Sequence, residues 1–77
     1  MIYYTGHAKG RIILRGITHE MIKNALMKPD KIGIGYQSRS LVFKKFSRGT
    51  IKVVFVKKKM SYIIVSVIWE LINKNKN

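Results

Sequence analysis

Residues 41–69, LVFKKFSRGTIKVVFVKKKMSYIIVSVIW, decide the fold of this 77-residue chain. Most of the stretch consists of β-branched and aromatic residues, which favour extended backbone. Two short polar segments interrupt it, SRG at 47–49 and KKKM at 57–60. Turns of three to five residues between such runs are typical of antiparallel hairpins. The pattern therefore predicts strands at 41–46, 50–56 and 61–69.

A fourth, glycine-interrupted strand is predicted just upstream, at 32–36, followed by the polar turn QSRS at 37–40. The strands at 50–56 and 61–69 carry apolar side chains on both faces, which is typical of central strands. Strict alternation in the last strand separates Tyr62, Ile64, Ser66 and Ile68 from Ile63, Val65, Val67 and Trp69. One sheet face is therefore partly apolar, and we expect a partner to cover it or a ligand to bind there.

Two helices are predicted before the strands. The first spans 7–15 and ends at Gly16, the residue type that favours the position after a helix end. Thr18 is placed to cap the second helix, and Glu20 lies in its first turn, where the helix dipole favours a negative charge. Pro29 ends this helix. The segment IYY at 2–4 is either a short strand or an extended lead-in.

Together these elements predict an α+β fold in the order ααββββ. Two helices cannot cover both faces of a four-stranded sheet, so we expect both to pack on one face of a four-stranded antiparallel sheet. The chain is long enough for one small core. We predict a single domain over residues 1–72 and a disordered tail at 73–77, which consists of Asn and Lys only.

Charge is the strongest global feature of the composition. Sixteen Lys and Arg residues face three Asp and Glu residues, for a formal net charge of +13. Such an excess favours a polyanion or an acidic protein as partner. The chain has no cysteine, which excludes disulfides, thiolate catalysis and cysteine-based zinc sites. It shows no signal-peptide or membrane-spanning pattern, so we expect a cytoplasmic protein without membrane contact.

His7, Arg11 and Arg15 recur every four residues and therefore form one stripe on the first helix. The arginines either cover the edge of the core with their charged ends in water or bind phosphate. His7 is a candidate general base. The three acids Glu20, Asp30 and Glu70 lie far apart, which argues against metal-dependent nuclease and glycosidase chemistry.

A chain with these groups can cleave only a substrate that carries its own nucleophile, and RNA has one in its 2′-OH. We therefore predict catalysis by His7, Arg11 and Arg15 with no metal and no cofactor. The residues predicted to hold the RNA backbone are Lys44, Lys45 and Arg48. Tyr36 and Tyr62 are predicted to stack bases, whereas Phe46 and Trp69 are expected to pack in the core.

The segment HAKGRIILRGITHEMIKNALMKPDKI, residues 7–32, carries the pattern His-x3-Arg-x3-Arg-Gly-Ile followed by a capped helix and a Pro break. It resembles a family of small prokaryotic domains of unknown function that are similar to the RelE and BrnT toxins. The resemblance implies a compact fold of the RelE and barnase kind that cleaves RNA without metal. Gly10 departs from the pattern because glycine weakens a helix interior. The matching residues are His7, Arg11, Arg15, Gly16, Ile17 and Pro29.

Three functions remain open from the sequence. The leading prediction is an endoribonuclease toxin of a toxin–antitoxin pair, with a small acidic antitoxin as its protein partner. The second is a non-catalytic nucleic-acid-binding module, because residues 11–27 mimic a helix-turn-helix. The third is a subunit that uses the apolar sheet face for protein association, and a second copy of the chain is one candidate partner. In the helix-turn-helix alternative, the second helix would offer only His19, Lys23, Asn24 and Lys28 for contacts with base edges.

Overall fold

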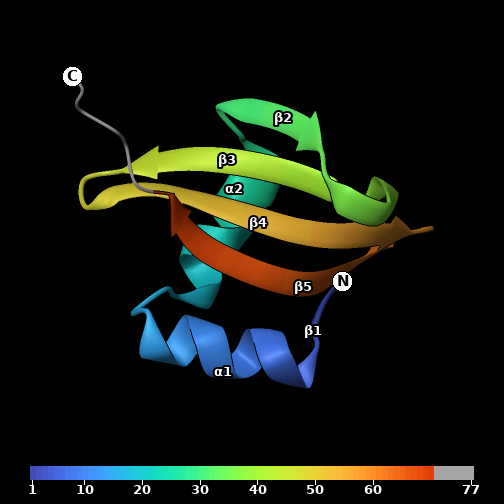
Figure 1. Ribbon diagram of the computed structural model, residues 1–77, viewed down its shortest axis with the longest axis horizontal. Helices are drawn as coiled ribbons and strands as arrows, with labels where there is room; N and C mark the ends of the chain where they lie inside the picture. Colours follow the sequence, from blue (N-terminus) through green and yellow to red (C-terminus); the bar gives the residue numbers. More distant parts are fainter. Residues whose placement is uncertain (71–77) are drawn as a thin grey trace.

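The computed structural model describes residues 1–70 (Figure 1). The predicted disordered tail at 73–77 lies outside these residues. The helices are α1 (Gly6–Leu14) and α2 (His19–Met27), and a short 3-10 turn, η1, spans Tyr36–Ser38. The strands are β1 (Ile2–Tyr4), β2 (Lys31–Ile34), β3 (Ser40–Phe46), β4 (Gly49–Lys58) and β5 (Ser61–Glu70). None of the helices in this part of the chain has the length and apolar character needed to cross a membrane.

The strands form one mixed sheet of five strands in the order β1-β5-β4-β3-β2. The predicted α+β class with two helices is confirmed, but the four-stranded antiparallel sheet is wrong. The difference is β1, which pairs in parallel with β5, with Ile2 opposite Tyr62 and Tyr4 opposite Ile64. This three-residue segment is too short to predict from its own pattern, because its stability comes from a partner about sixty residues away.

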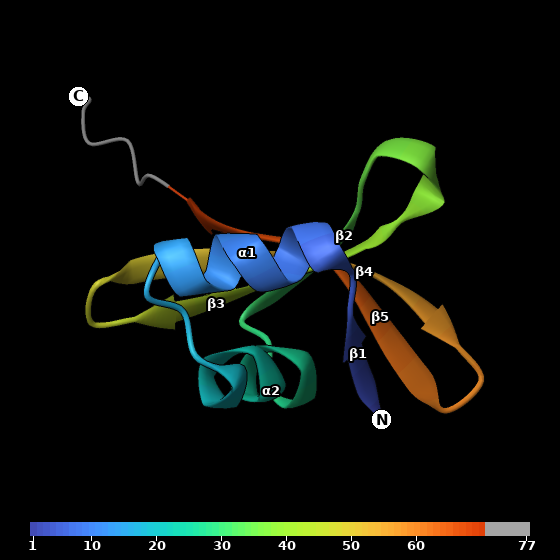
Figure 2. The same ribbon diagram turned by 90° about the horizontal axis from the view of Figure 1, so that it is seen from below.

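The two helices take different positions on the sheet. α2 covers one face, behind β3 and β4 in Figure 1, whereas α1 runs along the outer edge of β5 (Figure 2). The opposite face carries no helix from the described part of the chain (Figures 1 and 2). The core lies between α2, α1 and the sheet. Its buried residues are Ala8, Ile17, Ile22, Ala25, Val42, Ile51, Val53, Phe55, Ile64 and Val67.

The helix ends follow local signals in the sequence. Thr5 caps α1, and its hydroxyl accepts a hydrogen bond from the backbone N–H of Ala8 at 3.1 Å. Gly16 adopts a left-handed φ of 66°, which lets the N–H of Ile17 return to the carbonyl of Ile12 at 3.0 Å. Thr18 caps α2 as predicted, through a hydrogen bond from Met21 N–H at 3.1 Å.

A bulge in β5 changes which side chains face the core. Val54 of β4 pairs with Ser66, whereas the next residue, Phe55, pairs with Ile64, so Val65 is an extra residue in β5. As a result Ile64 and Val67 are both fully buried although they are three residues apart. The predicted strict alternation along residues 61–69 is therefore wrong, because the bulge reverses the pattern at Val65.

Two further boundaries differ from the prediction. β2 ends at Ile34 and not at residue 36, and the chain then forms η1, in which Gln37 and Ser38 have left-handed φ values of 60° and 59°. β4 extends to Lys58, so the turn to β5 holds only Lys59 and Met60 rather than the four residues 57–60. β4 and β5 extend further than predicted because cross-strand pairing continues through Lys57 and Lys58, which lie opposite Tyr62 and Ser61.

Candidate functional site

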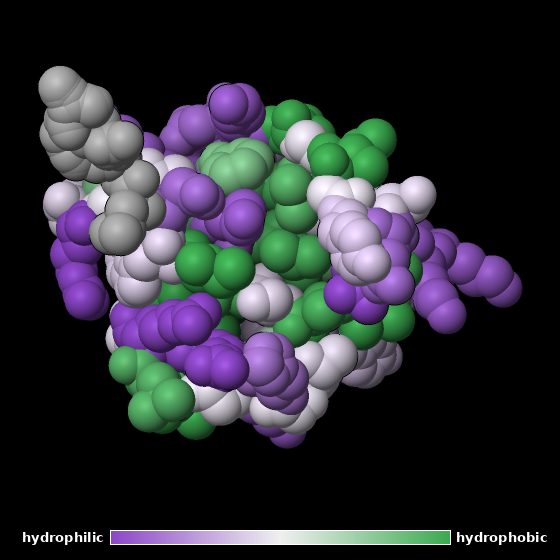
Figure 3. All heavy atoms as spheres, in the orientation of Figure 1, coloured by the Kyte–Doolittle hydropathy of each residue, from purple (hydrophilic) through white to green (hydrophobic). Residues whose placement is uncertain are grey.

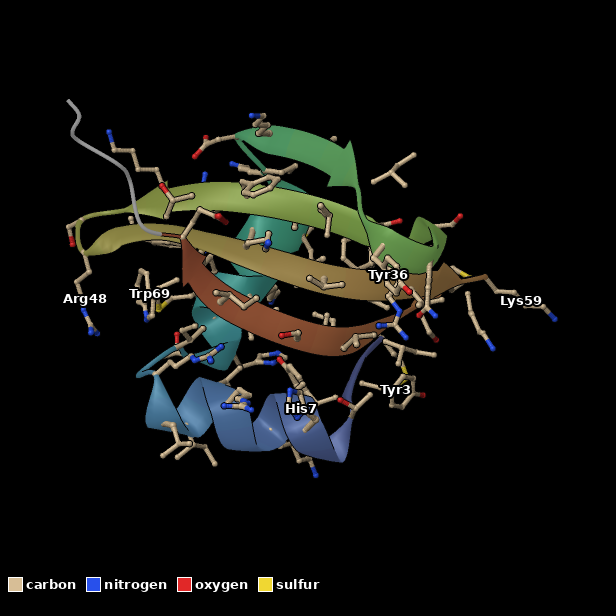
Figure 4. All side chains as sticks on the ribbon, viewed as in Figure 1. Tyr3, His7, Tyr36, Arg48, Lys59 and Trp69 are labelled. Carbon is tan, nitrogen blue, oxygen red and sulfur yellow. The ribbon has the colours of Figure 1, made fainter. Side chains whose placement is uncertain are left out.

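The start of α1 brings two of the predicted catalytic residues together. Arg11 Nε donates a long hydrogen bond of 3.4 Å to His7 Nε2, and both side chains are exposed. The pair arises because residues four apart share one face of a helix. Figure 4 shows His7 on the first turns of α1, below β5. In such a surface pair the arginine can bind a phosphate group of a substrate, and the histidine can accept a proton from that substrate or donate one to it.

Arg15, the third residue of the stripe, holds α1 against the sheet. Its Nη1 donates to the carbonyl of Val67 at 2.8 Å, and the indole N–H of Trp69 donates to the Arg15 carbonyl at 2.8 Å. β1 pairs with β5 only from Tyr62 to Ile64, and no other strand within residues 1–70 pairs with the rest of that edge. Arg15 therefore satisfies a backbone acceptor at an open sheet edge, and at least one of its N–H groups is engaged within the protein.

Arg48 joins this end of α1 from the β3–β4 turn. Its guanidinium lies 5.1 Å from the centre of the Trp69 ring, a cation–π distance, and Figure 4 shows the two side chains next to each other. Arg48 also lies close to Gly16, where an added Cβ would meet Nη1 at 3.3 Å. Arg15 and Arg48 thus put two positive charges at the C-terminal end of α1, where the helix dipole favours cations.

The other predicted RNA-binding residues do not form one cluster with His7 and Arg11 of α1. Lys44 and Lys45 are neighbours on β3 and point to opposite faces of the sheet. Asp30 contacts both, because its carboxylate lies 3.9 Å from Lys44 Nζ and accepts from the Lys45 backbone N–H at 2.8 Å. Tyr36 is 85% exposed on η1, at the end of the molecule opposite Arg48 (Figure 4). Tyr62 lies on the helix side of the sheet, near β1.

The sheet face without helices carries a band of half-buried apolar side chains, which we call the open face. Figure 3 shows hydrophobic residues in the middle of this face and hydrophilic ones around them. Its apolar residues are Leu41, Phe43, Val54, Val56, Ile63 and Ile68. Lys31 lies over the Phe43 ring at 5.7 Å, and Lys52 lies 3.9 Å from the carboxylate of Glu70. The open face is thus apolar with a predominantly cationic border.

Sequence reasoning missed a pocket of about 430 Å³ between α2 and the start of the chain. Tyr62 contributes to it, and so does His19, whose Nδ1 is hydrogen-bonded to the hydroxyl of Tyr4. Burial raises the pKa of Tyr4 above its ordinary value of 10.0, so the hydroxyl stays protonated at neutral pH and donates a hydrogen bond to Nδ1 in the tautomer whose Nδ1 has no proton. The one signal of this pocket in the sequence is the i, i+4 spacing of His19 and Lys23, which places both side chains on the same face of α2. The lining residues are Met1, Ile2, His19, Lys23, Leu26, Met27 and Tyr62.

Comparisons of this chain with family models, with curated proteins and with solved structures found no match. Its function is therefore inferred from its own residues and their arrangement.

Proposed function

We propose that this protein binds RNA through α1 and the adjacent edge of the sheet. The observation that carries the proposal is the excess of cations over acids, sixteen against three. Two of the acids are already engaged, Asp30 with Lys44 and Glu70 with Lys52. Arg11 of α1 and Arg48 of the β3–β4 turn are exposed and then remain for a polyanion. RNA phosphates supply closely spaced negative charge.

The contact between His7 and Arg11 favours cleavage of the bound RNA, the activity expected of an endoribonuclease toxin. In this reaction His7 Nε2 accepts the proton of the 2′-OH, and the 2′-oxygen attacks the adjacent phosphorus. The bond from phosphorus to the 5′-oxygen breaks, that oxygen takes up a proton from a water molecule, and His7 then releases its own proton to the solvent. The products are a 2′,3′-cyclic phosphate and a 5′-hydroxyl. Arg11 donates to the phosphate oxygens and stabilises the charge that develops there.

The geometry without RNA allows Arg11 to change its hydrogen-bond partner from His7 to a phosphate. At 3.4 Å the hydrogen bond from Arg11 to His7 is weak. A phosphate is a stronger acceptor for a guanidinium than a neutral imidazole, so bound RNA draws Arg11 away and frees Nε2. No metal ion takes part in the step as written.

The experiment is cleavage of a labelled single-stranded RNA by the purified chain in the presence of EDTA. We expect His7→Ala to slow cleavage about 10²- to 10⁴-fold, the usual contribution of one positioned acid or base. Arg11→Ala is expected to slow it as well. Lys9→Ala is the matched control, because Lys9 is an exposed cation on the same helix. The DNA strand of the same sequence is expected to stay intact.

Loss of cleavage in EDTA, or equal cleavage of DNA, contradicts the proposed reaction. Full activity of folded His7→Ala contradicts the role of His7. RNA binding that is retained without any cleavage by the wild-type chain favours the non-catalytic nucleic-acid-binding module.

The open face favours a second, compatible proposal, an acidic protein partner such as an antitoxin. Its apolar centre offers area to bury, and lysines outnumber acids at its border, so charge complementarity selects an acidic segment. The test measures the affinity of the protein encoded by the neighbouring reading frame for wild type and for Val54→Lys, a change in the middle of the face. We expect at least a tenfold loss. Unchanged affinity, or a neighbouring frame that is not acidic, contradicts this proposal.

A further inference from the structure

The pocket between α2 and the start of the chain has the dimensions and the chemistry of a small-molecule site. Its volume of about 430 Å³ falls within the usual range for ligand pockets, about 300–1,000 Å³. Segments that are distant in sequence form its walls, because its lining residues come from the start of the chain, from α2 and from β5. Ile2, Leu26 and Met27 give it apolar surface.

Tyr62 provides an aromatic wall that the rest of the protein holds in place. Its ring packs against Phe55 with centroids 5.4 Å apart, and Phe55 is itself buried in the core. Lys57, the cross-strand neighbour of Tyr62, has its ammonium 5.0 Å from the ring centre. A ring fixed in this way loses little freedom when a flat ligand stacks on it.

The α2 side of the pocket supplies hydrogen-bond donors. His19 is held through Nδ1 by Tyr4, which leaves its Nε2 without a partner among residues 1–70. In the tautomer whose Nδ1 accepts from the Tyr4 hydroxyl, Nε2 carries the proton and is a donor. Lys23 lies one helical turn further along and forms no ion pair within the described chain. A donor and a cation on one helix face match the oxygens of an anionic group.

We propose that this pocket binds a nucleoside 5′-phosphate, either free or as an unpaired nucleotide of an RNA chain. The base lies against Tyr62 within the apolar walls, and the phosphate receives hydrogen bonds from His19 Nε2 and Lys23 Nζ. A fatty acid would use the apolar walls and Lys23, but it has no flat ring to stack on Tyr62 and no group that needs a second hydrogen-bond donor beside Lys23. The site is separate from the RNA cleavage proposed above, because neither His7 nor Arg11 lines the pocket.

The first test titrates the full-length chain with adenosine 5′-monophosphate and follows backbone amide signals by NMR. We expect saturable shifts concentrated at Ile2, His19, Lys23 and Tyr62, and weaker binding of adenosine, which lacks the phosphate. Decanoate serves as the apolar anion probe. Binding of decanoate at these residues without binding of the nucleotide overturns the proposal, as does the absence of saturable shifts with the nucleotide.

Variants separate the two halves of the site. Lys23→Gln is expected to weaken nucleotide binding at least about fivefold and to remove most of the advantage of the monophosphate over adenosine. Lys9→Gln, an exposed lysine on α1, is the matched control and leaves binding unchanged. Tyr62→Leu is expected to weaken binding roughly 5- to 150-fold, the usual effect of losing one base–aromatic stack, whereas Tyr62→Phe retains it. Equal affinity of Lys23→Gln and Lys9→Gln overturns the phosphate contact even where Tyr62→Leu fails to fold.

A five-nucleotide single-stranded RNA distinguishes the two sources of the ligand. Tighter binding of this RNA than of the monophosphate, weakened by Lys23→Gln, assigns the pocket to an unpaired nucleotide of RNA. Binding of the monophosphate alone assigns it to a free nucleotide. The RNA arm uses His7→Ala so that cleavage does not interfere, and loss of cleavage in that variant leaves pocket binding unchanged.

Discussion

Arg15 was predicted from the sequence to be catalytic, and in the structure its side chain forms a hydrogen bond that attaches α1 to the sheet. Its spacing from His7 and Arg11 placed it in a catalytic stripe, yet its guanidinium donates to the Val67 carbonyl on the open edge of β5. A backbone acceptor that loses such a donor stays desolvated and unpaired. The helix period predicted the shared face correctly, but the partner of Arg15 is 52 residues away and only packing selects it.

We predict that Arg15→Ala lowers the free energy of unfolding by about 1.5–3 kcal/mol, the usual contribution of a hydrogen bond from a charged group. Arg11→Ala, on the same helix but exposed, is expected to change it by less than about 0.5 kcal/mol. Urea unfolding followed by circular dichroism measures both. Equal stability of the two variants contradicts the structural role of Arg15.

Tyr4 predicts a dependence of stability on pH. Burial raises its pKa in the folded chain above the ordinary value of 10.0. In the unfolded chain the hydroxyl therefore deprotonates first, so the contribution of Tyr4 is complete below about pH 10 and declines as pH rises through the folded pKa. We expect the wild type to lose more stability than Tyr4→Phe between about pH 8 and pH 11. Parallel pH profiles of the two proteins in urea unfolding contradict this linkage.

At the scale of elements, the connection between α1 and α2 depends on one left-handed residue. Gly16 has a φ of 66°, and an added Cβ would also approach Arg48 at 3.3 Å. We expect Gly16→Ala to lower the free energy of unfolding by about 1–2 kcal/mol, the cost of a left-handed conformation for an L-residue. Thermal unfolding of the two proteins measures the difference.

Gly10 is the matched control for this prediction. It lies inside α1, has no atom within 4 Å of an added Cβ and has no left-handed backbone angle. Gly10→Ala is therefore expected to raise the free energy of unfolding by about 0.5–1 kcal/mol. A loss of stability in this variant contradicts the helical assignment of residue 10.

The strands show why element positions are easier to predict than strand registers. β-branched runs and turn residues located β3, β4 and β5, because each signal acts within a few residues. The bulge at Val65 left no such local signal, since Ser66 and Val65 are both compatible with either face. The position of the bulge follows from the burial of both Ile64 and Val67 in the core.

At the scale of the whole molecule, net charge makes the proposed RNA binding depend on salt. The formal charge of +13 arises from residues spread over both helices, β2, β3, β4 and several turns, whereas β5 carries no Lys or Arg. Each phosphate that a cation neutralises adds about −0.7 to the slope of log affinity against log salt for single-stranded RNA. We expect a slope steeper than about −2 in filter-binding titrations between 50 and 200 mM salt. Affinity that does not change with salt over this range contradicts polyanion binding and favours protein association.

The α+β class, the Thr18 cap of α2, the strand-rich second half and the basic surface of α1 could be predicted from the sequence. Each depends on interactions between residues a few positions apart, which a linear pattern records. Only the tertiary structure decided the parallel pairing of β1 with β5, the carbonyl that engages Arg15 and the pocket around Tyr62. These features join residues that lie about forty to sixty positions apart. Such contacts form where burial and backbone pairing repay the entropy of closing a long loop, and no short sequence pattern encodes which distant partner does so.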